Sequence, residues 1–256
     1  MNTLQRIVAQ TRRAVEQRQR TRPLNGPGPR SDIRDFGDAL ARPGLSLIAE
    51  HKRRSPSAGA IREDRSLTEV VGAYERGGAA ALSILTEGPN FGGGLDDLAT
   101  ARQASSLPLL RKDFIVDPYQ VLEAWTAGAD AVLLIVAALG ESDLAALHEQ
   151  VLASGLTPLV EVHDERELGI ALELGARVIG INNRDLTTLE VDIRRGLDLV
   201  RAMPDGVLKV AESGFSTREE LRELEAAGFD AVLMGEALLR SDDIEAACRV
   251  LTAPTM

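Results

Sequence analysis

From Leu45 onward the chain alternates between short apolar runs and longer amphipathic segments. The amphipathic segments are typical of helices and include "SLTEVVGAYERGG", "PYQVLEAWTAGA", "SDLAALHEQVLASG", "DERELGIALELG" and "TREELRELEAAG". Several of them begin with Ser, Asp or Thr and end with Gly, as helix caps require. The apolar runs are typical of strands and cover residues 45–50, 81–86, 107–113, 131–136, 157–162, 178–182, 207–213 and 231–236.

The continuous apolar character of these runs predicts a parallel sheet whose two faces are both covered. Four times a helix-ending glycine leads directly into a strand, in "GGAAAL", "GADAVL", "GARVIG" and "GFDAVL", which is a weak internal repeat. Eight such units predict an α/β fold of the closed (β/α)8 TIM barrel type. An open doubly wound sheet is the alternative, although no glycine-rich fingerprint follows the first strand.

The segment before the first strand predicts an N-terminal helical extension over residues 1–44. Leu4, Ile7, Val8 and Val15 have the spacing of one helix face, and "RTRPLNGPGPRS" indicates a loop before any second helix. We expect a single domain over residues 1–256.

Composition limits the class of partner. Acidic residues outnumber basic ones by 39 to 29, and the resulting net charge of −10 disfavours nonspecific nucleic-acid binding. The longest apolar run, residues 131–140, is too short to span a membrane, and the single cysteine, Cys248, cannot form an internal disulfide. We therefore expect a cytoplasmic protein with a small-molecule partner, no nucleic-acid or membrane partner, and a monomeric state, with a dimer as the alternative.

Polar residues gather at the carboxyl ends of the predicted strands, where TIM barrels carry their catalytic side chains. These residues are Glu50, Lys52, Thr86, Glu87, Lys112, Asp113, Glu161, Asn182, Arg184, Glu212, Ser213, Gly235 and Glu236. Lys112 interrupts the apolar run "LPLLRKDFIV", and a buried lysine is costly unless it is paired. Strand alternation directs Lys112 into a shared pocket, and Arg111 and Asp113 toward the helices. Structural salt bridges alone are the alternative interpretation.

The ends of the last two strands indicate a phosphate site. "ESGF" and "MGEA" place Gly214 and Gly235 where the backbone can approach an anion closely, and "KRRSPS" (52–57) adds cations and hydroxyls, Ser55 among them. We interpret "FGGG" (91–94) as a flexible loop before a helix. The three histidines, His51, His148 and His163, lack ligand spacing, so we interpret each as solvated or hydrogen-bonded and predict no metal site.

Taken in order, eight motifs resemble the indole-3-glycerol phosphate synthase family of tryptophan biosynthesis. They are "LIAEHKRRSPS", "ALSILTE", "LLRKDFIVDPYQV", "GADAVLLIVAAL", "LVEVHDE", "IGINNRDL", "VAESG" and "AVLMGEAL". The resemblance implies the ring closure of 1-(2-carboxyphenylamino)-1-deoxyribulose 5-phosphate, with loss of CO₂ and water, without cofactor or metal.

The resemblance also implies roles for individual residues. Lys112 is then the general acid, Glu161 the base in dehydration, and Glu50 and Lys52 complete the proton-transfer network. The residues implied to position the substrate or bind its phosphate and ring are Asn182, Arg184, Glu212, Ser213, Gly214, Gly235, Glu236, Phe114 and Leu133.

The chain departs from the family pattern at three places: Ala58 replaces a loop lysine, His51 replaces an apolar or aromatic residue, and "TEGPNFGGG" is a variant loop. Two other functions share the same features. A Schiff-base aldolase would use Lys112 or Lys52, and borohydride would trap that lysine in the presence of substrate. A noncatalytic phosphate-binding barrel would instead tolerate the loss of Lys112 and Glu161.

Overall fold

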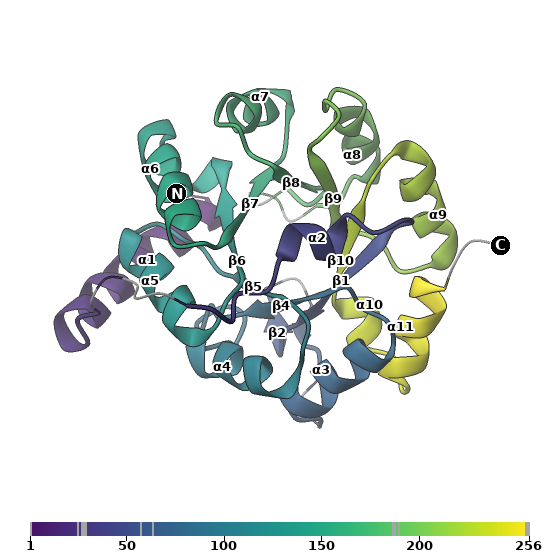
Figure 1. Cartoon of the computed structure of the whole chain (residues 1–256), viewed down its shortest axis with the longest axis horizontal. Helices are drawn as coiled ribbons and strands as arrows, with labels where there is room; N and C mark the ends of the chain where they lie inside the picture. Colours follow the sequence, from purple (N-terminus) through teal and green to yellow (C-terminus); the bar gives the residue numbers. More distant parts are fainter. Residues whose placement is uncertain are drawn as a thin grey trace.

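The computed structural model describes residues 2–24, 26, 30–56, 58–62, 64–185, 188 and 190–253, and its centre is a closed ring of parallel strands (Figure 1). The ring runs in the order β1-β10-β9-β8-β7-β6-β5-β4, and β1 pairs with both β4 and β10 to close it. The strands are β1 (Ser46–His51), β4 (Ala81–Leu85), β5 (Leu109–Lys112), β6 (Ala131–Ile135), β7 (Thr157–Val162), β8 (Val178–Asn182), β9 (Leu208–Glu212) and β10 (Ala231–Met234).

Each of the eight apolar runs corresponds to one barrel strand, with β1 extending one residue further to His51, so the predicted TIM barrel is confirmed and the open sheet is wrong. A two-stranded hairpin that the sequence did not reveal, β2 (Arg54–Ser55) with β3 (Gly59–Ala60), lies in the loop after β1. Ser57, part of the predicted "KRRSPS" loop, lies outside the described residues.

Helices surround the ring, as Figure 1 shows. They are α3 (Leu67–Arg76), α4 (Leu95–Ala104), α5 (Pro118–Ala127), α6 (Glu141–Ala153), α7 (Glu165–Glu173), α8 (Ile193–Val200), α9 (Arg218–Ala227), α10 (Glu236–Leu239) and α11 (Ile244–Thr252), with a 3-10 turn η1 (Val136–Ala138) after β6. Several predicted caps are present: Ser66 and Thr217 cap α3 and α9 through capping boxes, and Gly128 and Gly228 end α5 and α9 in the left-handed conformation. The predicted start of α6 at Ser142 is wrong, because the helix begins at Glu141 with Gly140 as its N-cap.

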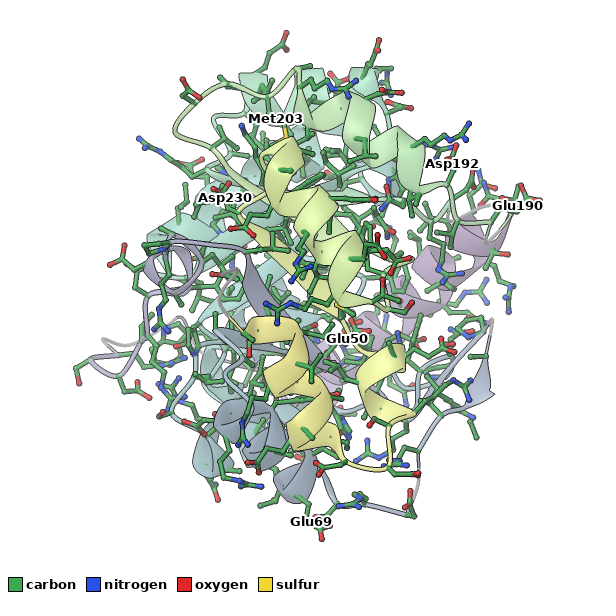
Figure 2. All side chains as sticks on the ribbon, turned by 90° about the vertical axis from the view of Figure 1, so that its right-hand side faces the viewer. Glu50, Glu69, Glu190, Asp192, Met203 and Asp230 are labelled. Carbon is green, nitrogen blue, oxygen red and sulfur yellow. The ribbon has the colours of Figure 1, made fainter. Side chains whose placement is uncertain are left out.

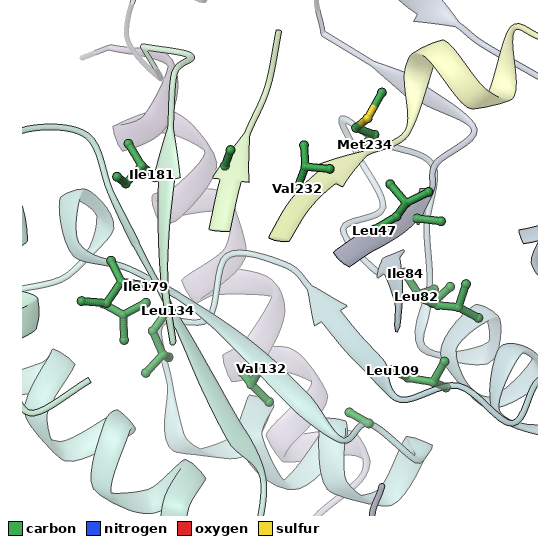
Figure 3. Close-up of a cluster of buried hydrophobic side chains, with 14 of the residues drawn as sticks. Leu47, Leu82, Ile84, Leu109, Val132, Leu134, Ile179, Ile181, Val232 and Met234 are labelled. Carbon is green, nitrogen blue, oxygen red and sulfur yellow. The ribbon is translucent and has the colours of Figure 1, made fainter. Parts of the chain in front are cut away.

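The larger hydrophobic core lies between the strands and the helices. Figure 3 shows part of it, formed by side chains that leave the strands toward the helix layer. Its labelled members are Leu47, Leu82, Ile84, Leu109, Val132, Leu134, Ile179, Ile181, Val232 and Met234. Because strand side chains alternate, the residues between these point into the barrel.

A second core fills the barrel and connects it to the N-terminal segment. The segment forms two helices, α1 (Thr3–Thr21) and α2 (Phe36–Leu40), as the sequence predicted. Phe36 and Leu40 of α2 and Leu4 and Ile7 of α1 belong to the same buried cluster as the inward-facing strand residues. Parts of the predicted loop between the helices, residues 25 and 27–29, lie outside the described residues. None of the described helices is long and apolar enough to span a membrane.

Arg111 is fully buried on the outer side of β5, as strand alternation predicted. Its guanidinium donates to Thr86 Oγ1 at 3.1 Å, to the Gln120 carbonyl at 2.6 Å and to Asp113 Oδ2 at 2.8 Å. Glu123 of α5 lies 3.3 Å from the same guanidinium and also accepts from Arg18 of α1 at 2.6 Å. This network ties α1 and α5 to the strand that carries Lys112.

We expect Arg111→Met to lower the free energy of unfolding by about 3 kcal/mol, because it leaves buried carboxylates without their shared cation. Denaturant titration followed by circular dichroism measures the loss. The matched control is Arg201→Met, since Arg201 pairs with Asp198 on the exposed surface and its loss should cost less than about 1 kcal/mol. Equal losses in the two variants would contradict a structural role for the buried network.

Candidate active site

A cavity of about 450 Å³ opens at the carboxyl ends of the barrel strands. All fourteen residues predicted as site residues line it: Glu50, Lys52, Ser55, Lys112, Phe114, Leu133, Glu161, Asn182, Arg184, Glu212, Ser213, Gly214, Gly235 and Glu236. In Figure 2 Glu50 is seen near the middle of the molecule, whereas Glu69 and Glu190 lie at its periphery. The closed ring thus brings residues from seven strand ends to one place.

Lys112 ends β5 and lies between two buried carboxylates. Its Nζ is 2.7 Å from Glu212 Oε2 and 3.2 Å from Glu161 Oε2. Burial alone would lower the pKa of Lys112, but Glu212, Glu161 and Glu50 raise it above its usual value. The ammonium form is therefore strongly favoured, and the charges at this strand end are paired as the cost of burial requires.

The two carboxylates that share Lys112 differ in their surroundings. Burial acts to raise the pKa of Glu161, yet Lys112, His163 and a 3.1 Å hydrogen bond from Asn182 Nδ2 lower it below its usual value. Burial raises the pKa of Glu212, and the negative charges of Glu161 and Glu50 add to this. Glu212 Oε1 is buried and has no hydrogen-bond partner among the described residues. Lys112 acts against this rise through its 2.7 Å contact, but within the described part of the chain Glu212 has no second cation or amide donor beside it as Glu161 has.

Gly180 makes room for Glu212, a contribution that sequence reasoning missed. A Cβ atom built on Gly180 of β8 would collide with Glu212 Oε1. Any larger residue would therefore displace the carboxylate that holds Lys112. The glycine lies inside an apolar strand, where a close approach of another group is a common reason for its presence.

A second lysine–carboxylate pair lies at the end of β1. Lys52 Nζ is 2.8 Å from Glu50 Oε1, and Ser83 Oγ is 3.4 Å from Glu50 Oε2. Burial acts to raise the pKa of Glu50, but Lys52 and Lys112 lower it below its usual value. The buried Tyr74 hydroxyl donates to the Glu50 backbone carbonyl at 3.0 Å, which fixes this part of β1.

The segment after β9 turns sharply at the cavity. Ser213 and Gly214 both have positive φ, 65° and 98°, a conformation that a non-glycine residue adopts at some cost. Asn183 Nδ2 donates to the Ser213 carbonyl at 3.1 Å and thereby holds the turn. Consecutive residues of this kind turn their backbone N–H groups toward a common side, as in anion-binding loops.

Gly235 has a packing role that the sequence did not reveal. A Cβ atom there would lie 3.0 Å from both the Cβ and the carbonyl oxygen of Glu50. The glycine is therefore needed first for the contact with β1, and not only for the approach of a ligand. Glu236 follows it, and its Oε1 is 2.9 Å from Arg240 Nε, so the carboxylate is turned along α10 toward a cation.

The apolar wall of the cavity contains an aromatic residue that the sequence analysis placed in a flexible loop. Phe91 lines the cavity beside Phe114, with ring centroids 6.5 Å apart. The carboxylate of Glu87 accepts hydrogen bonds from the backbone N–H groups of Asn90 and Phe91 at 2.7 and 2.9 Å. The loop is thus organised from the end of β4. The available signal in the sequence was an aromatic residue, Phe91, in the loop that follows a predicted strand end.

Helix α1 supplies the other part of the site that the sequence did not reveal. Thr3, Leu4 and Ile7 line the cavity, and Arg240 of the segment after α10 does so as well. The helical spacing of Leu4 and Ile7 predicted a buried face, but it did not indicate which surface that face would cover.

The three histidines have different surroundings. His51 is buried in β1, and burial together with Arg53 lowers its pKa to about 4. His148 is buried in α6. His163 is hydrogen-bonded, with Nδ1 3.0 Å from Glu167 Oε2, and its Nε2 lies 3.3 Å from Glu161 Oε1. The hydrogen-bonded alternative is therefore confirmed for His163, whereas the solvated alternative is wrong for all three, since each is buried. No group of three or more His, Cys, Asp or Glu residues within the described part of the chain is arranged to hold a metal ion.

Known proteins resemble this chain in sequence and in fold. A family model described as indole-3-glycerol phosphate synthase matches residues 4–251. A Streptomyces coelicolor protein named indole-3-glycerol phosphate synthase 2 is 53% identical over 210 residues, which cover 82% of this chain and 81% of the relative. A protein from Koribacter versatilis, named indole-3-glycerol phosphate synthase, is 44% identical over 256 residues, which cover 98% of each chain.

Among solved structures, 3-hexulose-6-phosphate synthase from Salmonella typhimurium superposes with a TM-score of 0.64 at 13% identity, over 81% of this chain and 96% of that one. Thiamine phosphate pyrophosphorylase from Pyrococcus furiosus superposes with a TM-score of 0.62 at 18% identity, over 85% of this chain and 96% of that one. At such identities the likeness shows only a shared barrel fold. The sequence matches extend over nearly the whole chain at close to half of its positions. The chain therefore belongs to the indole-3-glycerol phosphate synthase family.

Proposed function

We propose that the family's reaction takes place in this cavity through acid–base catalysis centred on Lys112 and Glu161. Indole-3-glycerol phosphate synthases are decarboxylating lyases of tryptophan biosynthesis, and this chain has that activity. The observation that carries the residue assignment is the position of the Lys112 ammonium, within 3.2 Å of two buried carboxylates at the cavity wall.

The ring closure demands a proton donor at its first step. The ring carbon that bears the carboxylate attacks the ketone carbon, and the C=O π electrons move to oxygen, which takes a proton from Lys112. Departure of CO₂ then returns its bonding electrons to the ring. A lysine that keeps its proton until an oxyanion forms nearby suits this role, and positioned acids of this kind contribute about 10²- to 10⁴-fold.

Dehydration requires a base as well as an acid. The new hydroxyl leaves as water with a proton supplied through the Lys52–Glu50 pair, and a carbon-bound proton is removed as the indole double bond forms. Glu161 is the proposed base, since the surroundings that lower its pKa keep it ionised. We assign the Lys52–Glu50 pair, 2.8 Å apart, to the proton-transfer network, and Asn182 and Glu212 to holding the reacting groups in place.

The remaining residues fit the two ends of the substrate. Phe114, Leu133 and Phe91 offer an apolar slot for the aromatic ring. At the other end, the turn at Ser213 and Gly214 and the backbone N–H groups of residues 235 and 236 are proposed to cradle the phosphate, with Ser55 and Arg184 beside them.

We further propose that the chain functions as one barrel domain with the N-terminal extension as part of it, and that it acts in the cytoplasm on this small phosphorylated substrate. The support is the contribution of α1 to both the inner core and the cavity wall, together with the biosynthetic role of the family.

Lys112→Met should lower kcat by at least about 10²-fold while the fold is retained, because the variant lacks the proton donor. A fluorescence assay of indole-3-glycerol phosphate formation measures the rate, and circular dichroism verifies the fold. Lys209→Met is the matched control, since Lys209 lies on β9 and outside the cavity. Wild-type turnover by Lys112→Met would remove this lysine from the mechanism.

Glu161→Gln should abolish most activity and change KM by less than about tenfold, because the carboxylate acts in proton transfer and not in uniform binding. Steady-state kinetics with the same assay separate the two parameters. The isosteric amide keeps the hydrogen bond with Asn182 possible, so an unchanged kcat would show that Glu161 is not the base.

Glu236→Ser should leave KM within about threefold of wild type, since the carboxylate is turned toward Arg240 and only the backbone of residue 236 would contact phosphate. Gly235→Val should raise KM more than about tenfold, because a branched side chain blocks the approach of the phosphate. It should also lower kcat, because the side chain displaces Glu50. Wild-type kinetics for Gly235→Val would place the phosphate elsewhere.

A further inference from the structure

His163 lies behind Glu161, on the side of that carboxylate away from the first cavity. The histidine follows β7 directly and does not line the active-site cavity. It lines a second cavity of about 530 Å³, which Glu161 does not reach. Glu161 therefore faces the first cavity and His163 the second, and Leu4 lines both.

Glu167, in the first turn of α7, fixes the histidine from the other side. Its Oε2 accepts from the His163 backbone N–H at 2.9 Å and lies 3.0 Å from the ring Nδ1. On the opposite side the ring Nε2 is 3.3 Å from Glu161 Oε1. The imidazole is thus hydrogen-bonded to Glu167 and within ion-pair distance of Glu161, although Nε2 makes no hydrogen bond among the described residues. An imidazolium is the form that both carboxylates stabilise.

The wider surroundings of His163 are mixed in charge. The second cavity is lined by Asp164, Glu165, Glu167, Asp185, Arg195 and Asp198, and Lys112 lies beyond Glu161. Burial opposes the charged form of His163, yet the neighbouring Glu161 and Glu167 raise its pKa to about 10. The ring therefore carries a positive charge throughout the neutral pH range.

The charge on His163 matters because Lys112 has two carboxylate neighbours and one positive charge. Glu161 has a second cation beside it, whereas the nearest charges to Glu212 other than Lys112 are the carboxylates Glu161 and Glu50. A proton that binds to one of the two carboxylates beside Lys112 therefore binds preferentially to Glu212. Without the imidazolium the two carboxylates would compete for it on more equal terms, and Glu161 would be protonated for part of the time.

We propose that His163 is a positioning residue, which acts as an imidazolium held by Glu167 and fixes Glu161 as the ionised carboxylate beside Lys112. This inference rests on the proposed role of Glu161 as the base. Two residues outside the first cavity, His163 and Glu167, then determine which of the carboxylates beside Lys112 stays ionised.

The kinetic test compares the pH dependence of kcat/KM in wild type, His163→Asn and Glu167→Gln. Loss of a neighbouring positive charge raises a carboxyl pKa by about one unit or more. In His163→Asn we expect the acid limb of the kcat/KM profile to move by about one pH unit to higher pH. On that limb kcat/KM should be roughly tenfold below wild type, whereas on the plateau at higher pH it should be within about threefold of wild type. Glu167→Gln should shift the limb in the same direction by less. Glu165→Gln is the control, since Glu165 is an exposed carboxylate on the same helix, and its profile should match wild type.

A second measurement does not depend on activity. The chain has only three histidines, so their imidazole signals can be separated by NMR of the ¹⁵N-labelled protein. We expect His163 to remain protonated at pH 8 in wild type, and its pKa to fall by at least one unit in Glu161→Gln and in Glu167→Gln. Thermal denaturation of each variant verifies that the fold is retained.

The outcomes separate this inference from the function on which it rests. A neutral His163 ring at pH 7, or a loss in His163→Asn that is the same at every pH, overturns the inference and leaves Lys112 and Glu161 in their roles. Full activity of Glu161→Gln instead removes the proposed base itself, and the role of His163 in catalysis with it.

Discussion

The structure depends on one buried ammonium, that of Lys112, held between the carboxylates of Glu161 and Glu212. Removing three charged groups from water is costly, and only close pairing with further hydrogen bonds compensates. The surrounding features meet this need: Asn182 donates to Glu161, Gly180 leaves room for Glu212, and Glu50 adds negative charge near the lysine. The arrangement that makes burial of the lysine tolerable also keeps it protonated.

Strand β5 carries a charged side chain on each of its two faces, and the two side chains have different surroundings. Lys112 points into the cavity, whereas Arg111 is buried against Glu123 and Asp113 in the helix layer. Through Glu123 and Arg18 this outer network holds α1, and α1 in turn places Leu4 and Ile7 over the cavity. The packing of the N-terminal helix and the position of the lysine are therefore coupled through one four-residue strand.

The closed barrel explains why residues so far apart in sequence share one site. Parallel strands direct all their carboxyl ends to one rim, so Glu50 and Glu236 become neighbours around the ring although the whole barrel separates them in the chain. Structures with this fold but other names superpose on the chain at low identity. The barrel alone therefore does not determine the chemistry.

The sequence by itself determined the eight strands, their parallel arrangement and the polar residues at their carboxyl ends, because burial on two faces and helix capping leave strong local patterns in the chain. It also identified Lys112 as exceptional, since a charge within an apolar run needs a reason. Only the tertiary structure decided which charges meet. The contacts of His163 with Glu161, of Gly180 with Glu212, and of Phe91 with Phe114 join segments whose distance and orientation depend on the packing of the whole barrel. Local residue patterns record whether a side chain is buried, but not which neighbour it is buried against.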